Sequence, residues 1–424
     1  MTGPRPLAST AKKPITGRSL LLGLLLPTGL VPGAAIAGPS LTIERALGLA
    51  EDNAPMQQEL QAKADRAEGR ARAASLWPNP RLNLSQEHFS VDGGDTTQRF
   101  YSLSQEFDLS GQRGLRTRAA RARVEGVRRD NAWTRLQRRA RVSKRFYMVL
   151  FHKRRISALT QSLDRLDRVA DIVAERRRAG AASGYDQHRL ERERATLRSR
   201  LRQARAEREQ SWSQLRSMLP TDAGLPESVT GRLRPGQVSP LNRYRNALDQ
   251  RPDLRRLQAQ ARAAELEQRA AGRAWVPDVT VGLGLTTVDA PGGDGSGSLL
   301  ELTVPLPAFD RGQAEAASAR ARHTRAEARY RRLLDRARAE VRGLWRQTGE
   351  LDEATTEFRD QALAKSREVT EIAESAYRAG ELGILELLDA YRGQLKAHLR
   401  ALELARAARA SWIDLARTAG SGSP

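Results

Sequence analysis

Apolar positions along this chain follow two periods, that of a helix and that of a strand. Five apolar residues between positions 159 and 173 are spaced 4, 3, 3 and 4, which is the seam of a coiled coil. Apolar and polar residues alternate within 101–109 and again within 279–285, as in strands with one apolar face. The pattern therefore predicts long coiled-coil helices combined with short extended segments. The coiled-coil set is Leu159, Leu163, Leu166, Val169 and Val173.

The same order of landmarks occurs twice along the chain. Pro55 matches Pro252 at an offset of 197 residues, and Gly180 matches Gly380 at an offset of 200. A nearly constant offset indicates an internal duplication. We therefore expect two repeats separated by a linker. The expected bounds are 38–220 for the first repeat, 221–240 for an irregular equatorial linker, 241–419 for the second repeat and 420–424 for a tail.

Each repeat is expected to contain a helix, two strands, a very long helix and a return helix. The long helices would reach about 100 Å at 1.5 Å per residue, and the strands have the length of a tilted membrane strand. In the first repeat the expected elements are 42–76, 81–91, 98–109, 112–179 and 185–219. In the second they are 241–274, 278–288, 298–306, 313–379 and a return helix that begins after Gly383.

The first 37 residues have the order of a secretory signal peptide. A basic leader precedes the apolar run 20–26, and Ala35-Ile36-Ala37 is a small-residue cleavage pattern. Export argues against a nucleic-acid partner, which the formal net charge of +22 first suggests. The rest of the chain has no apolar run of about 18 residues, so a membrane domain is expected to be a closed β-barrel.

The residues that carry enzyme or metal chemistry form no recognisable constellation. Neither Gly-x-Ser-x-Gly nor His-Glu-x-x-His occurs, and there is no cysteine. The five histidines are scattered, with no two of them three or four residues apart. We therefore expect no catalytic residues, no cofactor, no metal site and no enzymatic activity.

Several segments resemble one known family. The stretch from Leu41 to Pro55 resembles the opening of the TolC-type outer membrane efflux proteins, and Arg251 to Leu254 resembles the start of their second repeat. The run from Tyr377 to Gly380, followed by 385–390, is similar to their second helical turn. The stretch 109–116 resembles the cobalt–zinc–cadmium and copper branch of the family. The resemblance covers the whole mature chain.

The resemblance implies a mainly α protein with a membrane β part. It implies a homotrimer in the outer membrane of a Gram-negative-type bacterium. Each subunit would give four strands to a 12-stranded β-barrel in the outer membrane lipid and its helices to a periplasmic coiled-coil barrel. The helical tips would dock on a periplasmic adaptor protein that links the duct to an inner-membrane RND pump.

The expected docking tips are the two helical turns. Glycine permits a tight turn and close backbone approach there. The tip residues are Arg178, Gly180 and Gly184 in the first repeat and Arg378, Gly380 and Gly383 in the second.

Three acids beyond the tips are candidates for a channel gate. Glu386 and Asp389 lie one helical turn apart on one face, and the resemblance marks them as the family's constriction acids. Asp186 is the matching acid of the first repeat, where Arg189 stands in place of a second acid. The alternative is that Glu386 and Asp389 are surface acids that pair with arginines such as Arg378 or Arg392.

Two tryptophans mark the ends of the helices that lead to the strands. Trp77 and Trp275 are equally consistent with plain packing and with anchors at the membrane interface.

Three functions remain open at this point. The first is the passive exit duct of a tripartite efflux pump, with metal cations as the cargo that the branch suggests. The second is the outer-membrane duct of a type I protein secretion system, which has the same fold. The third is a periplasmic coiled-coil structural protein, which would contain no strands.

Overall fold

The computed structural model describes residues 40–91, 94–178, 180, 183–220 and 224–421. The predicted signal peptide lies outside the described residues. So do parts of the first strand turn (92–93), of the first tip (179, 181–182), of the linker (221–223) and of the tail (422–424). Everything below concerns the unit that begins at Ser40.

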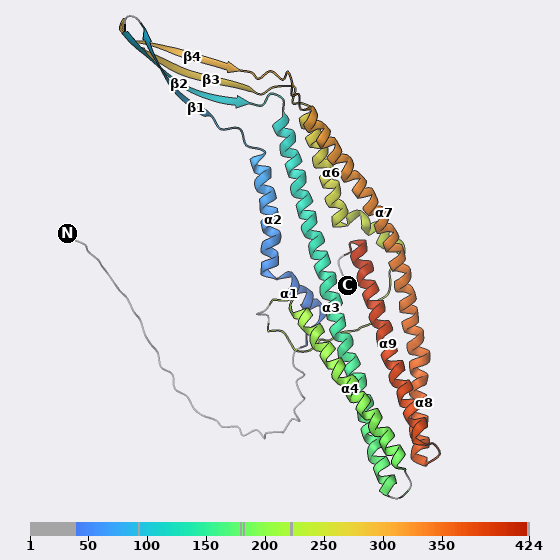
Figure 1. Ribbon diagram of the computed structural model, residues 1–424. Coiled ribbons are helices and arrows are strands. Elements are labelled where there is room, and N and C mark those ends of the chain that lie inside the picture. The colour runs from blue at the N-terminus through green and yellow to red at the C-terminus, as the bar shows by residue number, and fades with distance from the viewer. Residues whose placement is uncertain (1–39, 92–93, 179, 181–182, 221–223, 422–424) are drawn as a thin grey trace, which may run out of the picture. The chain divides into compact units, whose positions relative to one another are not determined.

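Two antiparallel helical pairs form most of this unit (Figure 1). In the first pair, α3 (Gln112–Arg178) is continuous over 67 residues and α4 (Gly184–Arg216) returns along it. In the second pair, α9 (Ile384–Ala419) returns along α7 (Gln313–Glu357) and α8 (Ala364–Ala379). The two pairs meet through α3 and α9. Within the described ranges, no helix is both long and apolar enough to cross a membrane.

The coiled-coil seam predicted from the sequence is confirmed. Leu159, Leu166, Val169 and Val173 are buried, and Leu163 packs partly buried beside them. They share one apolar cluster with Leu190, Leu197 and Leu201 of α4 and with Ile384, Leu387 and Leu388 of α9. One stripe of α3 therefore holds both helical pairs together near the tips.

The predicted helices 42–76 and 241–274 are each wrong as single helices. The first is α1 (Ile43–Glu51) followed by α2 (Ala54–Ala73), and the side chain of Asn53 caps α2 by accepting from the Met56 N–H at 3.2 Å. The second is α5 (Leu241–Ala247), the 3₁₀ turn η1 (Leu248–Gln250) and α6 (Pro252–Ala271). The prolines near the start of α2 and α6 explain both breaks, because proline lacks the N–H that a helix interior needs.

The predicted continuous helix 313–379 is also wrong. A π-helical turn, η2 (Phe358–Leu363), separates α7 from α8. Just before it, the hydroxyls of Thr355 and Thr356 donate to the carbonyls of Leu351 and Asp352 at 2.6 and 2.8 Å. Such bonds bend helices, so they account for a local departure from α geometry at this point.

The strands of both repeats form one antiparallel sheet in the order β1-β2-β3-β4. They are β1 (Arg81–Val91), β2 (Gly94–Phe107), β3 (Val279–Asp289) and β4 (Gly295–Thr303). The register aligns Leu82, Leu103, Leu283 and Leu300 across all four strands. All four of these leucines are exposed in the single chain, so one face of the sheet is an apolar surface without a partner in the described chain.

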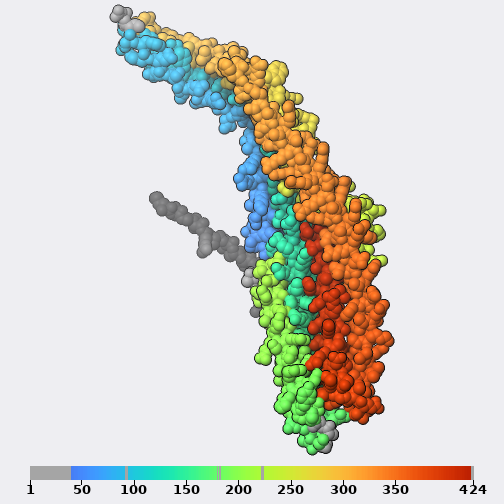
Figure 2. Space-filling view, turned by 45° about the vertical axis from the view of Figure 1, so that its right-hand side comes forward, coloured from blue at the N-terminus to red at the C-terminus, as the bar shows by residue number. Residues whose placement is uncertain are grey.

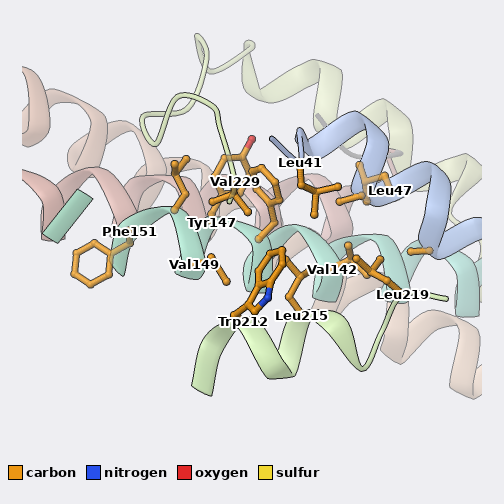
Figure 3. Close-up of a cluster of buried hydrophobic side chains, with 14 of the residues drawn as sticks. Leu41, Leu47, Val142, Tyr147, Val149, Phe151, Trp212, Leu215, Leu219 and Val229 are labelled. Carbon is orange, nitrogen blue, oxygen red and sulfur yellow. The ribbon is translucent and has the colours of Figure 1, made fainter. Parts of the chain in front are cut away.

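The strands and the helical tips lie at opposite ends of the described unit (Figure 2). The linker 224–240 and α1 lie between them. Leu41 pairs with Val229 in a parallel bridge, and both side chains enter a cluster with Phe146 and Tyr147 of α3 (Figure 3). Arg409 of α9 is buried and donates to the carbonyls of Leu233 and Arg232, each at 3.0 Å. The linker is therefore fixed to both helical pairs.

Candidate functional site at the helical tips

The first tip joins α3 to α4. Gly180 has a φ of +74°, a backbone conformation that residues other than glycine rarely adopt. Its N–H donates to the Arg177 carbonyl at 3.0 Å. Gly184 begins α4, and Ser183 is its N-cap. Gly180 therefore follows the end of α3, and Gly184 is the first residue of α4. The side chain of Ser183, between them, caps the start of α4.

Asp186 is already engaged by that cap. The Asp186 N–H donates to the Ser183 hydroxyl oxygen at 3.1 Å, and the Asp186 carboxylate accepts from the Ser183 N–H at 3.0 Å. This reciprocal arrangement is a capping box. Arg189, one turn further, donates to the Tyr185 hydroxyl at 2.9 Å. The first repeat thus uses its acid to start a helix.

The second tip joins α8 to α9 through a tighter main-chain turn. Gly380 has a φ of +82°, and the following Glu381 N–H donates back to the Ala376 carbonyl at 2.9 Å. This is the bonding of a Schellman turn, which satisfies the last carbonyls of a helix. Gly383 precedes α9 in an extended conformation and supplies no side-chain cap.

The two tips are tied together by a residue that sequence reasoning missed. Arg176 near the end of α3 donates to the carbonyls of Tyr377 and Arg378 at 2.9 and 3.3 Å. Its guanidinium also lies 4.8 Å from the centre of the Tyr377 ring. Tyr377 is buried, and burial raises the pKa of its phenol. The sequence shows three consecutive arginines, Arg176, Arg177 and Arg178, in the last turn of α3. Nothing in their spacing indicates that Arg176 is the one that contacts the second tip.

Glu386 and Asp389 lie in the first turns of α9, and both side chains are exposed. The residues between them, Leu387 and Leu388, are buried, so the helix is fixed while the two acids face outward. Among the described residues, neither acid forms an ion pair within 4 Å. Their carboxylates are therefore available to a neighbouring molecule.

The arginines proposed as partners for these acids pair elsewhere. Arg392 contacts Glu193 of α4 at 2.5 Å, and Arg378 lies 4.0 Å from Glu374. The hydrogen bond from Arg392 lowers the pKa of the Glu193 carboxyl and raises the pKa of the guanidinium. Glu193 and Arg392 thus join α4 to α9, a long-range pair that the local spacing of charges could not reveal.

The two tryptophans at the strand end differ in their surroundings. Trp77 is 51% exposed, stacks edge-on against Phe107 and carries the Arg113 guanidinium 3.5 Å from its ring centre. Trp275 is 63% exposed. Both keep a large free ring surface at the point where the helices meet the strands.

The family model described as "Outer membrane efflux protein" matches residues 46–221 and 244–421. The chain belongs to the outer membrane efflux protein family. It is accordingly an outer-membrane channel component of a tripartite efflux system, with its large helical part in the periplasm.

Among curated members of this family, similar proteins come from several bacteria. The chain is 26% identical over 383 residues to the cobalt-zinc-cadmium resistance protein CzcC of Cupriavidus metallidurans, with 86% of each chain covered. It is 25% identical over 392 residues to the pyoverdine export outer membrane protein OpmQ of Pseudomonas putida, covering 87% of this chain and 79% of that protein.

Solved structures share the fold. CusC, whose structures describe the formation of a transmembrane channel, superimposes with a TM-score of 0.73 at 18% identity, with 90% of this chain and 92% of CusC covered. VceC of Vibrio cholerae superimposes with a TM-score of 0.71 at 18% identity, with 90% and 96% covered. The predicted fold class is thereby confirmed, and the strands exclude a purely coiled-coil protein.

Proposed function

We propose that three copies of this chain form the exit duct of an RND-type tripartite efflux pump for metal cations. The observation that carries the trimer is the pair of open sheet edges. In the described strands, β1 and β4 are each paired on one side only. Unpaired strand edges are costly in lipid. Three such sheets joined edge to edge close a barrel of 12 strands and leave no edge exposed.

The apolar face of the sheet supports the same assembly. The row formed by Leu82, Leu103, Leu283 and Leu300 is exposed in the single chain, as is the parallel row with Leu84 and Leu285. A closed barrel would turn these rows toward lipid, where apolar side chains are stable. The opposite face carries small and polar residues such as Ser102, Ser104 and Gly284, which suit a water-filled interior.

The tips are the proposed contact with the periplasmic adaptor. A Cβ added at Gly180 would meet no heavy atom within 4 Å, and at Gly380 it would meet only Arg176, at 4.0 Å. Both glycines therefore lie at accessible turns where a partner's backbone can approach closely. Arg178 and Arg378 flank these turns and are exposed. The adaptor would connect the duct to the inner-membrane pump.

Glu386 and Asp389 are the proposed gate. Their exposed carboxylates would meet those of two other subunits around the threefold axis, which gives six acids in a narrow ring. Such a ring attracts cations and repels anions. Asp186 would contribute less, because its carboxylate is held by Ser183. The name of the relative CzcC supports metal cations as cargo.

Metal tolerance of the native host tests the proposed cargo. A strain without this gene is expected to grow poorly with added Zn²⁺, Co²⁺ or Cd²⁺, and the intact gene on a plasmid is expected to restore growth. Unchanged tolerance to all three ions, with the protein present in the outer membrane of the complemented strain, would rule out this cargo.

A further inference from the structure

An arginine-rich groove runs between the helices near the strands. Residues of α2, α3, α6 and α7 line it, and its volume is about 880 Å³. Five arginines and three acids contribute to the lining, so the formal charge of the groove is +5 − 3 = +2 per subunit. The arginines are Arg70, Arg116, Arg123, Arg256 and Arg322.

Two of the three acids of the groove join helices, and the third, Glu315 of α7, is exposed and forms no ion pair within 4 Å with a described residue. Glu267 of α6 is only 12% exposed at its side chain and contacts both Arg123 of α3 and Arg322 of α7, the latter at 3.3 Å. Asp130 of α3 lies 3.4 Å from Arg256 of α6. The Glu267 carboxylate thus pairs with two guanidinium groups, so these ion pairs leave an excess of positive charge in the groove.

Two arginines of the groove are free of such pairing. Arg70 and Arg116 are exposed, and neither forms an ion pair within 4 Å with any described residue. They come from different helices, α2 and α3, and line the same groove. Guanidinium groups present parallel N–H donors that match carboxylate and phosphate oxygens. Among the described residues, no side-chain acceptor is bound by Arg70 or Arg116, so both guanidinium groups are available inside a recess of net positive charge.

Four neighbouring helices contribute to the groove. The contacts run from α2 to α3, from α3 to α6 and from α6 to α7, so these helices form one layer in that order. Because both outer helices line the groove together with the two central ones, we infer that it lies on the concave side of this layer. In the proposed trimer, on which this step rests, the concave sides face the threefold axis and three grooves surround the duct.

We propose that this groove binds small multivalent oxyanions, of carboxylate or phosphate chemistry, as they pass through the duct. A positive recess concentrates anions, and a multivalent anion can contact Arg70 and Arg116 together. A free divalent cation is repelled at this level. A metal ion therefore crosses this section more easily as a polycarboxylate chelate of net negative charge than as the bare ion.

Calorimetric titration of the full-length, detergent-purified protein with tripolyphosphate and with citrate tests the binding. Because all lining residues belong to one subunit, this measurement does not depend on a conducting trimer. The test variant is Arg70→Gln/Arg116→Gln, and the control is Arg72→Gln/Arg118→Gln. The control residues are exposed, lie about 200° around the same helices and do not line the groove.

The test variant is expected to bind the probes about fivefold more weakly than the unchanged protein, since each exposed ion pair contributes modestly. The control is expected to match the unchanged protein, and binding is expected to weaken as salt is raised. A preference for one probe identifies the oxyanion. Equal affinities in all three proteins, or no binding of either probe at low salt, overturns the proposal.

Planar-bilayer recordings of the same three proteins separate this proposal from the trimeric duct. If the protein forms no channels while the calorimetric difference remains, the duct model fails and the groove stands. If channels form and the double variant binds like the unchanged protein, the duct stands and the groove proposal fails.

Discussion

Arg176 of the first repeat donates a hydrogen bond to the main-chain carbonyl of Tyr377 in the second repeat, at 2.9 Å. The two residues are 201 positions apart in the chain. The bond supplies a donor to a carbonyl at the end of α8 that has no partner within the helix, and the helix dipole favours a positive charge there. It makes the geometry of one tip depend on the other.

Removal of that bond should loosen the second tip. Arg176→Ala is expected to cost about 1 kcal/mol of local stability, because the carbonyls of Tyr377 and Arg378 lose their donor. Amide hydrogen exchange at residues 380–383 should become faster. Arg178→Ala is the matched control, since Arg178 is exposed and contacts neither carbonyl. Equal exchange in both variants would show that the tips are independent.

A second prediction concerns the adaptor contact. Gly380→Leu combined with Gly180→Leu should abolish efflux while trimers still reach the outer membrane. The side chains would enter open space, but the positive φ angles strain each turn by about 1–2 kcal/mol. Gly380→Asn with Gly180→Asn should disturb the turn less, because asparagine tolerates this conformation. Metal tolerance and cross-linking to the adaptor measure the outcome, and persistent efflux in the leucine variant would move the docking site elsewhere.

A third prediction concerns the gate. Glu386→Ala/Asp389→Ala should raise single-channel conductance, reduce cation selectivity and weaken block by trivalent cations from the periplasmic side. The blocking concentration should rise about tenfold, which requires a loss of only about 1.4 kcal/mol. Asp186→Ala should change these properties less, because Ser183 already occupies its carboxylate. If the double variant behaves like the unchanged channel, the two acids are ordinary surface residues.

A fourth prediction concerns acid stability. Arg392 lowers the pKa of Glu193 below its ordinary value of 4.5. The stabilisation is therefore fully present above about pH 4.5 and is lost as the pH falls through the lowered pKa of the folded state. Glu193→Gln should reduce stability at pH 7 by about 1 kcal/mol and reduce the further loss on acidification. Thermal melts at pH 7 and pH 3 measure this, with Glu209→Gln, an exposed acid, as the control. Parallel losses in both variants would contradict a role for the Glu193–Arg392 pair.

The sequence predicts those helices and strands in which apolar residues recur at a fixed spacing. The seam at Leu159 and Leu166 and the alternation in β3 are visible because burial on one face imposes a spacing. The breaks before α2 and α6 are harder to predict, because a proline such as Pro55 or Pro252 fits the first turn of a helix and does not by itself show that another helix ends just before it. The π-helical turn was missed because Thr355 and Thr356 do not differ in type from other polar helix residues.

The long-range contacts at the tips could not be predicted in the same way. The spacing along α9 makes Arg392 a candidate partner for Asp389, whereas it pairs with Glu193 in the other repeat. Which of many arginines meets which carboxylate depends on how two hairpins pack, and charge spacing along one helix carries no such information.

The mass of the detergent-solubilised protein tests the central claim most directly. Mild extraction from outer membranes, followed by native mass measurement, should give an assembly of three chains, because only the joining of β1 to β4 between subunits removes both open edges. Disruptive charges on the edge strand, such as Leu300→Lys/Leu302→Lys, should reduce its recovery in the outer membrane. A stable monomer that inserts and conducts in planar bilayers would contradict the shared-barrel account.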